Sequence, residues 1–232
     1  MANIFDEKAS TYLVDIADSI GQPEKALRFY MDRKIRRISK RIVGKNILNI
    51  LDFGCGIGLS LKALAEYFPN AQIIGTDPSI QSLREARKSV EKFNNIRIID
   101  EAIFSLEKNF HSSFDVIVLS CVLHHVPEEE RLIFLSNLRK YLKPGGILAV
   151  IEHNSWNPIT RKIVRNCPLD EGVVLVNQKD LTQTLTNEDW NILGIEYVSF
   201  VPFKFRKLSF IEGLFKGIPI GAQYIVYAEK LV

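Results

Sequence analysis

Hydrophobic positions along the chain follow two different periods, and the changes between them mark the predicted elements. Short, continuous apolar runs that end at glycine or at acidic residues are typical of strands buried on both faces of a sheet. Segments with apolar residues three and four positions apart are typical of helices that pack on such a sheet. The predicted strands are 46–53, 71–77, 96–100, 114–120 and 147–152, and the predicted helices between them are 59–68, 79–93 and 129–141.

The order of these elements predicts the fold class. Strands and helices alternate from residue 46 to residue 152. Because connections between parallel strands of one sheet are right-handed, this alternation predicts a doubly wound α/β sheet with helices on both faces. The final strands 193–203 and 221–232 predict a late hairpin, after a helix at 179–190. Two stretches without a regular pattern should lie as cap segments over one end of the sheet, 154–178 and 203–220.

The N-terminal region is predicted to be a helical cap over 1–45, followed by a main domain over 46–232. Residues 8–43 have helical periodicity, which Gly21 and Pro23 interrupt. Basic residues crowd the stretch 33–45, where isoleucines recur at helical spacing, so we expect an amphipathic helix with a solvated basic face. The alternative is a patch that contacts RNA or an anionic substrate. The isoleucines are Ile35, Ile38 and Ile42, and the basic residues are Arg33, Lys34, Arg36, Arg37, Lys40, Arg41 and Lys45.

The composition is that of an ordinary globular chain: 232 residues, 47% hydrophobic, 25% charged, with a net charge of +3. This charge is too small to demand a polyanionic partner, and no apolar run approaches the roughly 20 residues that span a bilayer. We therefore expect no membrane partner and no nucleic-acid partner, and we expect no signal peptide. Three widely spaced cysteines (Cys55, Cys121 and Cys167) favour the reducing cytoplasm over a disulfide framework, and no residue cluster indicates a structural metal.

A glycine-rich loop stands between a predicted strand and a predicted helix, in the sequence LDFGCGIGLS (51–60). Its glycines let the backbone turn tightly and let a ligand approach closely. A nicotinamide fingerprint would need a glycine at position 59, where Leu59 stands. Asp52 precedes the loop, and its negative charge suits a cationic or zwitterionic ligand better than a phosphate. The three glycines are Gly54, Gly56 and Gly58.

Carboxylates end successive predicted strands. Asp77 ends the second strand, where an acid can accept hydrogen bonds from both ribose hydroxyls of an adenosine lying across the sheet. Asp100 and Glu101 end the third strand, where an acid can accept from an adenine amino group. Acids at strand ends also cap helices, but three in succession favour a nucleoside ligand.

Five motifs over residues 46–153 resemble, in order and spacing, those of the class I S-adenosylmethionine-dependent methyltransferases. They are ILDFGCGIG, IIGTDPS, IIDEAI, FDVIVLSCVLHHV and LKPGGILAVIEH. The resemblance implies a Rossmann-like, seven-stranded, mostly parallel sheet whose last strand is antiparallel. It also implies S-adenosyl-L-methionine as cofactor and a small-molecule methyl acceptor, and it allows a homodimer. The segment FDEKASTY (5–12) resembles a lead-in in which a tyrosine, here Tyr12, closes over the cofactor.

The same resemblance implies roles for individual positions. The glycine loop would line the methionine portion, with Asp52 near its amino group, and Asp77 would hold the ribose. Glu101 stands where many members carry Asp, so the acid that faces adenine is left open between Asp100 and Glu101. The complete set implied for cofactor binding is Tyr12, Asp52, Gly54, Cys55, Gly56, Gly58, Asp77, Pro78, Asp100, Glu101, Ala102, Ser120 and Cys121.

Two histidines follow strands at the edge where the acceptor should bind. A sulfonium methyl is already activated, so the protein must align the acceptor, exclude water and, for a hydroxyl, remove a proton. His125 and His153 titrate near neutrality and are the candidate bases, whereas His124 is expected to pack. Glu152 is the third candidate catalytic residue. Because successive strand side chains face opposite ways, we expect one of Glu152 and His153 to face the pocket and the other to brace the next loop.

Missing motifs narrow the reaction. The sequence SCVLHH replaces the Asp/Asn-Pro-Pro-Tyr/Phe clamp of enzymes that methylate nucleic-acid bases or amides. Asp115 lies at the wrong end of its strand for a catechol-type metal site, so no metal is expected. The prediction is O-methylation of a small or medium-sized metabolite. The alternatives are N- or C-methylation of a small molecule, or a non-catalytic cofactor-binding module that contacts RNA through residues 33–45.

Overall fold

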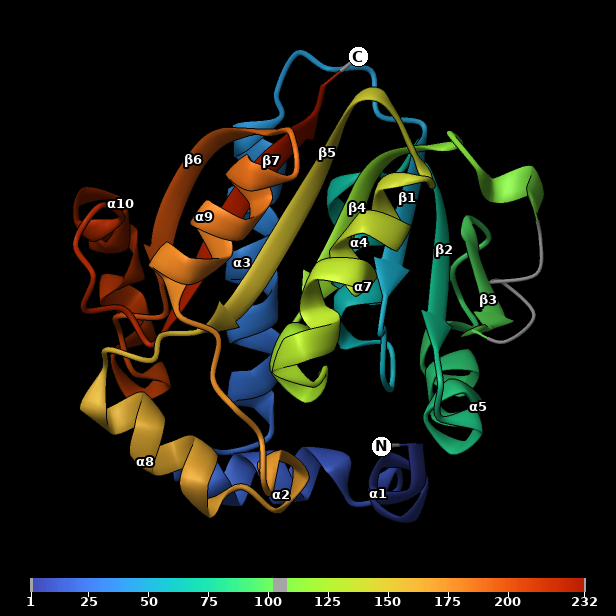
Figure 1. Ribbon diagram of the computed structural model, residues 1–232. Coiled ribbons are helices and arrows are strands. Elements are labelled where there is room, and N and C mark those ends of the chain that lie inside the picture. The colour runs from blue at the N-terminus through green and yellow to red at the C-terminus, as the bar shows by residue number, and fades with distance from the viewer. Residues whose placement is uncertain (1, 102–107, 232) are drawn as a thin grey trace.

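The computed structural model describes residues 2–101 and 108–231, which form a seven-stranded sheet in the order β3-β2-β1-β4-β5-β7-β6 (Figure 1). The strands are β1 (Asn49–Phe53), β2 (Gln72–Asp77), β3 (Ile96–Asp100), β4 (Phe114–Ser120), β5 (Leu142–His153), β6 (Trp190–Val198) and β7 (Gln223–Lys230). The first five strands pair in parallel, and β7 is antiparallel to both β5 and β6. The predicted doubly wound sheet, its late hairpin and its antiparallel last strand are therefore confirmed.

Helices cover both faces of the sheet and its lower edge. They are α1 (Ala2–Lys8), α2 (Tyr12–Ile20), α3 (Lys25–Arg41), α4 (Leu59–Tyr67), α5 (Ile80–Val90), α7 (Arg131–Arg139), α8 (Pro158–Asn166), α9 (Gln178–Asn187) and α10 (Glu212–Phe215). Shorter 3-10 segments join them: η1 (Lys108–Phe110), η2 (Leu123–His125), η3 (Glu128–Glu130), η4 (Pro168–Asp170) and η5 (Phe203–Ile211).

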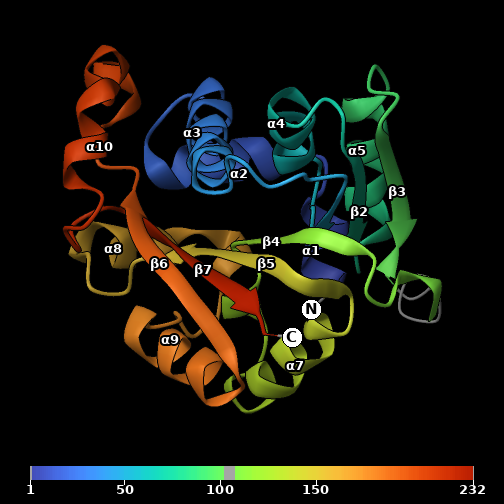
Figure 2. The same ribbon diagram turned by 90° about the horizontal axis from the view of Figure 1, so that it is seen from above.

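Two separate cores hold the layers together, one on each side of the sheet (Figure 2). Helices α3, α4 and α5 pack on one face through buried aliphatic side chains such as Ile38, Leu64 and Leu83. Helices α7 and α9 pack on the other face through side chains such as Leu138 and Leu185. The strands feed both cores because successive strand residues face opposite sides. Both faces are covered, which explains why the sheet strands read as continuous apolar runs.

The carboxyl ends of the parallel strands meet under a cap made from three distant parts of the chain. Figure 1 shows α1, α2 and α8 lying across this edge of the sheet. Gly21 ends α2 in the left-handed conformation, and α3 starts four residues later, as the predicted break at Gly21 and Pro23 requires. Asp6 of α1 accepts hydrogen bonds from the Ser79 hydroxyl (2.7 Å) and the Gln81 amide (3.1 Å), which ties the first helix to α5.

The prediction of an irregular segment over 154–178 is wrong in part, because α8 forms within it. The Asn157 side chain caps this helix by accepting from the amides of Ile159 and Thr160, and Pro158 occupies the first helical position. Asn and Pro are favoured at these two positions, so the local signal for a helix start was present in the sequence. The helix is short, and its apolar stripe is too brief to stand out as a periodic pattern.

The prediction of a solvated basic face over 33–45 is wrong for the inner half of that face. Arg33 forms a part-buried ion pair with Glu212 (2.8 Å), and Arg37 lies 3.7 Å from Glu196. Lys34 is only 6% exposed. The two arginines dock α3 against α10 and β6, and no local pattern in the sequence encodes these contacts. Within the described residues, the charge left for an RNA partner is therefore smaller than the composition suggests.

Candidate active site

A cavity of about 590 Å³ lies under the carboxyl edge of the sheet. Its wall runs from the glycine loop after β1, past the ends of β4 and β5, to the N-terminal helices and α8. Ten of the sequence-predicted site residues line it: Tyr12, Gly54, Gly56, Asp77, Pro78, Glu101, Ser120, Cys121, His125 and His153. The cavity thus joins the predicted cofactor residues to the predicted catalytic histidines in one space.

The glycine loop is held against β2 by its backbone. The amides of Gly54 and Cys55 both donate to the Thr76 carbonyl, at 2.8 and 2.9 Å. Gly54 and Gly56 have φ values of +76° and +52°, a region that favours glycine. A Cβ on Gly54 would lie 2.5 Å from Val122, whereas a Cβ on Gly56 would meet no protein atom within 4 Å. Gly56 therefore borders open space in the cavity wall.

Asp52 lies beneath this loop and is fully buried. Its Oδ2 accepts a hydrogen bond from the Ser60 hydroxyl at 2.5 Å, and its Oδ1 has no partner among the described residues. Burial raises the pKa of Asp52 to about 7, with the Asp77 carboxylate adding to the rise. A nearby positive charge would favour the ionised form, so the site is suited to a ligand that carries an ammonium group.

Two further acids stand at the ends of β2 and β3. Asp77 accepts from the amides of Gly56 and Ser79, both at 2.9 Å, while burial raises its pKa. Glu101 has a pKa raised to about 7 by burial, with smaller contributions from the charges of Asp77 and Asp100. Ala102, the remaining residue predicted beside adenine, lies outside the described residues. Within them, both acids keep polar oxygens near the cavity wall.

A histidine between two carboxylates forms the polar floor of the cavity. His124 is buried, with Nδ1 2.6 Å from Glu152 Oε2 and Nε2 3.5 Å from Asp170 Oδ1. Although burial disfavours the cation, the two carboxylates hold the pKa of His124 well above its ordinary value. In turn His124 lowers the pKa of both Glu152 and Asp170. The sequence predicted only packing for His124, yet the residue is the positive centre of this cluster.

The other two histidines have the opposite charge state. Burial, followed by repulsion from the His124 cation, lowers the pKa values of His125 and His153 to about 4. Both are therefore neutral imidazoles at pH 7. His153 has its ring 5.1 Å from that of His124, and the His125 ring lies 4.2 Å from His124. Two unprotonated rings thus flank one protonated ring at one side of the cavity.

Glu152 and His153 do not contact the cavity in the same way. The Glu152 carboxylate is buried under η2, where it accepts from the Leu123 amide at 2.8 Å as well as pairing with His124. His153 lines the cavity. This arrangement follows from strand alternation, which sends neighbouring side chains to opposite faces. Glu152 is placed to position His124 and the η2 backbone and has no direct access to a ligand.

Cys121, which lines the cavity, has a strained backbone conformation. This residue has φ +58°, which is uncommon for a side chain larger than hydrogen. The Gln223 side chain donates to its sulfur at 3.1 Å, and its amide donates to the Ile151 carbonyl. Strained residues of this kind cluster at binding sites because the surrounding contacts hold them in place. The neighbouring Ser120 hydroxyl is buried with no partner among the described residues.

Lys34 is a cavity residue that the sequence reasoning assigned to the solvated face. It extends from α3 into the cavity, and no carboxylate lies within ion-pair distance of its amine among the described residues. Burial raises the pKa of Cys121 and lowers that of His153, and the charge of Lys34 opposes the first shift and adds to the second. The signal that could have identified it is its position one helical turn before Ile38, on the apolar stripe of the helix. A lysine at this position interrupts the row of apolar side chains, which indicates that its ammonium group is buried.

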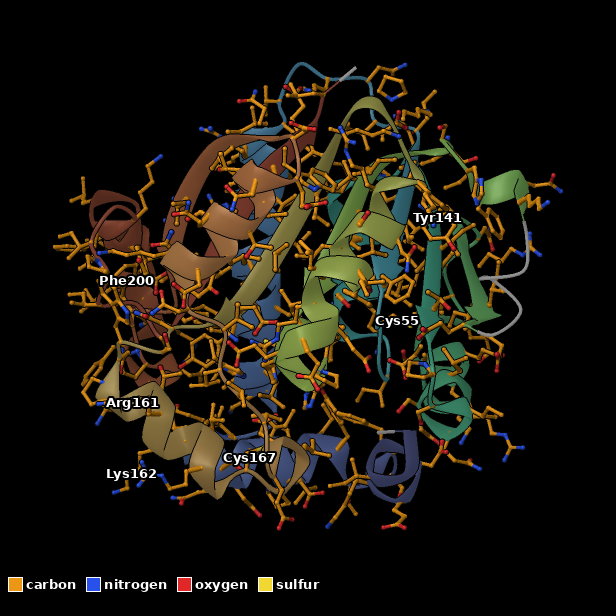
Figure 3. The ribbon with its side chains drawn as sticks, in the orientation of Figure 1. Cys55, Tyr141, Arg161, Lys162, Cys167 and Phe200 are labelled. Carbon is orange, nitrogen blue, oxygen red and sulfur yellow. The ribbon has the colours of Figure 1, made fainter. Side chains whose placement is uncertain are left out.

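Some predicted site residues support the cavity from behind. Among the predicted cofactor residues, Cys55 and Gly58 belong to the glycine loop but do not line the cavity. Cys55 is buried, and Gly58 lies against Ser89 and Ala86 of α5. Figure 3 shows Cys55 beside the ends of β1 and β2 and Cys167 near α2 and α8. His124, His125 and Asp170 also place three ligand atoms within 4.8 Å of one another, an arrangement able to hold a cation that the sequence did not predict.

Comparison with known proteins shows that the chain is similar to methyltransferases. A family model described as a methyltransferase domain matches residues 51–148. A ubiquinone biosynthesis O-methyltransferase from Bradyrhizobium sp. (strain ORS 278) is 32% identical over 211 residues, which is 86% of this chain and 78% of that protein. A trans-aconitate 2-methyltransferase from Azoarcus sp. (strain BH72) is 26% identical over 59% of this chain.

Structural similarity extends over more of the chain than most sequence matches do. The crystal structure of a SAM-dependent methyltransferase from Archaeoglobus fulgidus superposes with a TM-score of 0.64 at 19% identity, covering 88% of this chain and 94% of that one. This likeness concerns the fold alone. By contrast, the chain spans 36% to 52% of the length of the trans-aconitate 2-methyltransferases that it matches.

Proposed function

Because the chain belongs to the class I S-adenosylmethionine-dependent methyltransferases, we propose that it transfers a methyl group to an oxygen of a small or medium-sized metabolite. The observation that carries this proposal is the single cavity that joins the glycine loop to two neutral histidines. One end has the charges for a zwitterionic nucleoside, and the other end has groups that can accept a proton.

The residues at the glycine-loop end fit S-adenosyl-L-methionine. Asp52 Oδ1 is buried without a partner, and an ammonium group nearby would stabilise its ionised form. Lys34 also lines the cavity and offers a buried ammonium group for a carboxylate. The open space beside Gly56 accepts a ligand without steric conflict. We assign Asp77 to the ribose hydroxyls.

The remaining assignments complete the cofactor end. Glu101 is assigned to the adenine edge, and its raised pKa of about 7 makes it a hydrogen-bond donor as well as an acceptor near neutrality. Tyr12 lies at the start of α2 and lines the cavity, which suits a cover over the bound nucleoside. Ser120 and Cys121 border the same space from β4. When bound, S-adenosyl-L-methionine supplies a methyl group that its sulfonium already activates.

The protein has to align the acceptor and take its proton. We assign proton removal to a ring nitrogen of His153, which lines the cavity and is neutral at pH 7. The proton of the acceptor hydroxyl would pass to His153 as the oxygen takes the methyl group, and the S–CH3 bond of the bound cofactor would break with its electron pair left on sulfur. His125 is the second candidate for this step, because it shares the charge state and the cavity. Enclosure by α1, α2 and α8 excludes water and holds the reactants together.

The acceptor class is tested directly by methyl transfer. Relatives of this chain include trans-aconitate 2-methyltransferases and ubiquinone biosynthesis O-methyltransferases, so a carboxylic acid acceptor and O-methylation are both named among them. The purified protein should be incubated with radiolabelled S-adenosyl-L-methionine and a panel of hydroxyl, carboxylate and amine compounds that includes trans-aconitate. Label in oxygen-linked products is the expected result. Label confined to amine or carbon products would favour the alternative N- or C-methyltransferase.

A pH profile tests the assigned base. Lowering a histidine pKa to about 4 keeps the ring unprotonated, and so able to accept a proton, down to that pH. We expect kcat/KM for the acceptor, at saturating cofactor, to be nearly flat from about pH 8 to about pH 5 and to fall only near pH 4. A histidine with an ordinary pKa of about 6.5 would lose roughly thirtyfold in its basic form by pH 5. A limb near 6.5 would contradict the assignment.

Alanine at Gly56 tests the cofactor site. The added methyl group meets no protein atom but projects into the space assigned to the ligand, so we expect the affinity for S-adenosyl-L-methionine to fall about tenfold or more, measured by calorimetry. Gly44→Ala is the matched control, since Gly44 also has a positive φ (+88°) and no protein atom within 4 Å of its Cβ. Both variants should lose about 1–2 kcal/mol of stability from backbone strain. Equal cofactor affinity in the two variants would refute the assignment.

The non-catalytic alternative, a cofactor-binding module that contacts RNA through residues 33–45, has less support. Arg33 and Arg37 pair with Glu212 and Glu196, and Lys34 is buried. Calorimetry with S-adenosyl-L-methionine, NADH and RNA in parallel separates these functions. Binding of NADH without S-adenosyl-L-methionine would overturn the proposed cofactor.

A further inference from the structure

The segment 203–220, which comprises η5, α10 and the turn before β7, carries an unusual surface. We call it the basic-aromatic segment. Phe210 and Leu214 are 77% and 81% exposed, and other large apolar side chains stand out beside them. The exposed members are Phe205, Leu208, Phe210, Leu214, Phe215, Ile218 and Ile220. Single exposed apolar residues are ordinary, but such a concentration in one segment marks an interaction surface.

Basic side chains are interleaved with these apolar groups. Lys204, Arg206 and Lys207 are exposed, and no carboxylate among the described residues lies within ion-pair distance of them. Lys216, also exposed, lies 3.7 Å from Glu196. The segment has one acid, Glu212, and that acid is buried. The exposed surface of the basic-aromatic segment is therefore positive and apolar together.

The segment is anchored, although it projects from the body of the protein. The buried Glu212 carboxylate pairs with Arg33 at 2.8 Å and accepts from the amides of Phe200 and Val201. Arg33 also donates to the hydroxyl and carbonyl of Ser209. These bonds fix the inner side of the segment on α3 and leave the apolar and basic groups outside. The same bonds therefore bury Glu212 and leave the cations of the segment on its outer side.

Helix α8 continues the same surface. The Asn157 side chain donates to the Ile220 carbonyl at 2.8 Å, and Asn154 donates to the Pro219 carbonyl at 3.0 Å, so the start of α8 is tied to the end of the segment. Ile159 is 68% exposed at the start of that helix. Figure 3 shows Arg161 and Lys162 of α8 on the side of the molecule that also carries Phe200. Both cations are exposed.

We propose that the basic-aromatic segment, together with the start of α8, docks on the surface of an anionic lipid bilayer. Apolar side chains that enter the headgroup region beside cations that meet anionic headgroups are the features of interfacial binding. An RNA partner would use the cations but leave the aliphatic groups exposed. A second copy of this chain would bring like charges together. None of the helices in the described part of the chain has the length and apolar character needed to cross a bilayer, so the binding is peripheral.

This inference differs from the sequence expectation of no membrane partner. That expectation rested on the absence of a spanning run, which excludes insertion across a bilayer and does not address docking on its surface. Pro202, Ile220 and Ile159 line the cavity as well as bordering the docking surface. A docked protein therefore has the acceptor end of its cavity beside the lipid. Vesicle binding itself is independent of the proposed methyl transfer and is tested without it.

The test is flotation of the full chain with unilamellar vesicles, either of phosphatidylcholine alone or containing about 30% phosphatidylglycerol. We expect the partition coefficient to be at least about tenfold higher on the anionic vesicles at about 0.05 M NaCl and to fall strongly at about 0.5 M NaCl. The pair Phe210→Ser and Leu214→Ser should lower the partition coefficient about tenfold or more. The pair Lys204→Gln and Lys207→Gln should remove most of the preference for anionic vesicles.

Matched controls carry the same changes on distant surfaces. Leu132→Ser with Ile133→Ser removes two exposed apolar groups from α7, which Figure 2 places on the opposite side of the molecule from α10. Lys92→Gln with Lys140→Gln removes two exposed cations elsewhere. Both control pairs should bind like the parent protein. Equal binding to both vesicle types, no binding at low salt, or equal losses in the control pairs would overturn the proposal. So would self-association that Phe210→Ser and Leu214→Ser abolish in a protein that ignores vesicles.

Discussion

Replacing His153 with alanine is expected to lower turnover of an identified acceptor by about 10²-fold, the lower end of the range for a general base, because a pKa of about 4 makes the ring a weak base. The affinity for S-adenosyl-L-methionine should stay within a few-fold of the parent value. The reason is that the cofactor is assigned to the glycine loop, whereas His153 is assigned to the acceptor, although both line the same cavity. Single-turnover rates and calorimetry with the cofactor measure the two quantities separately.

His111→Ala is the control for removal of an imidazole. This ring lies against Tyr141 (ring centroids 5.7 Å apart) and does not line the cavity, so its loss should leave turnover unchanged. The pH profile distinguishes loss of the base from damage to packing. If His153 is the base, the alanine variant should no longer show the fall in kcat/KM near pH 4, whereas a variant that is damaged only in packing should still show it. Unchanged turnover in His153→Ala would remove this residue from the mechanism and leave His125 as the base to test.

The sheet was predictable because its strands are short, apolar and separated by helices of ordinary length. The run 147–152 illustrates how far this goes. Its apolar core identified the strand, but β5 begins at Leu142 and passes through Pro144, Gly145 and Gly146. Proline and glycine disfavour strands in general, and β4 pairs with Leu142 and then again from Ile147, with residues 143–146 forming the irregularity between the two pairings. The local apolar pattern thus predicted that a strand exists here, whereas the first residue of β5 is determined by its pairing with Phe114 of β4.

The site was predictable where its residues follow strand ends, since the carboxyl ends of parallel strands share one edge. Asp77, Cys121 and His153 come together in the cavity for this reason. Asp170 and Lys34 could not be found in this way. Asp170 reaches His124 from η4, and Lys34 enters from α3, so their distances to the cavity depend on how the caps fold over the sheet. Nothing in the spacing along the chain determines those distances.

Contacts between residues that are distant in the sequence also determine the charge states of the histidines. His124 and His125 are neighbours in sequence with the same intrinsic chemistry, yet their pKa values move in opposite directions. The difference arises because Glu152 forms an ion pair with the His124 ring alone. Asp170 Oδ1 lies 3.5 Å from a ring nitrogen of each histidine, and His125 also lies next to the resulting cation. Burial is the largest cause of the low pKa values of His125 and His153, and the two carboxylates contribute only by maintaining the His124 cation, which lowers these values further. This effect of the carboxylates is an indirect contribution to the proposed base that sequence pattern alone does not reveal.

Replacing Glu152 with alanine is expected to destabilise the protein by about 3–5 kcal/mol, the usual effect of removing one partner from a buried ion pair. The loss leaves His124 with only Asp170 and leaves the Leu123 amide without its acceptor. Urea unfolding at pH 6 measures the effect. Glu229→Ala is the control, because its pair with Lys45 lies at the surface and should contribute less than about 1 kcal/mol.

The pH dependence of this loss distinguishes the ion pair from simple packing. The folded protein lowers the pKa of Glu152, so the contribution of Glu152 is present above the ordinary value of 4.5 and disappears as the pH falls through the folded value. It raises the pKa of His124, so that contribution is complete below 6.5 and disappears as the pH rises through the folded value. The destabilisation by Glu152→Ala should therefore be largest between about pH 4.5 and about pH 6.5. A difference that is constant from pH 4 to pH 9 would mean that the carboxylate acts through packing and its bond to Leu123, and that the charge of His124 does not depend on it.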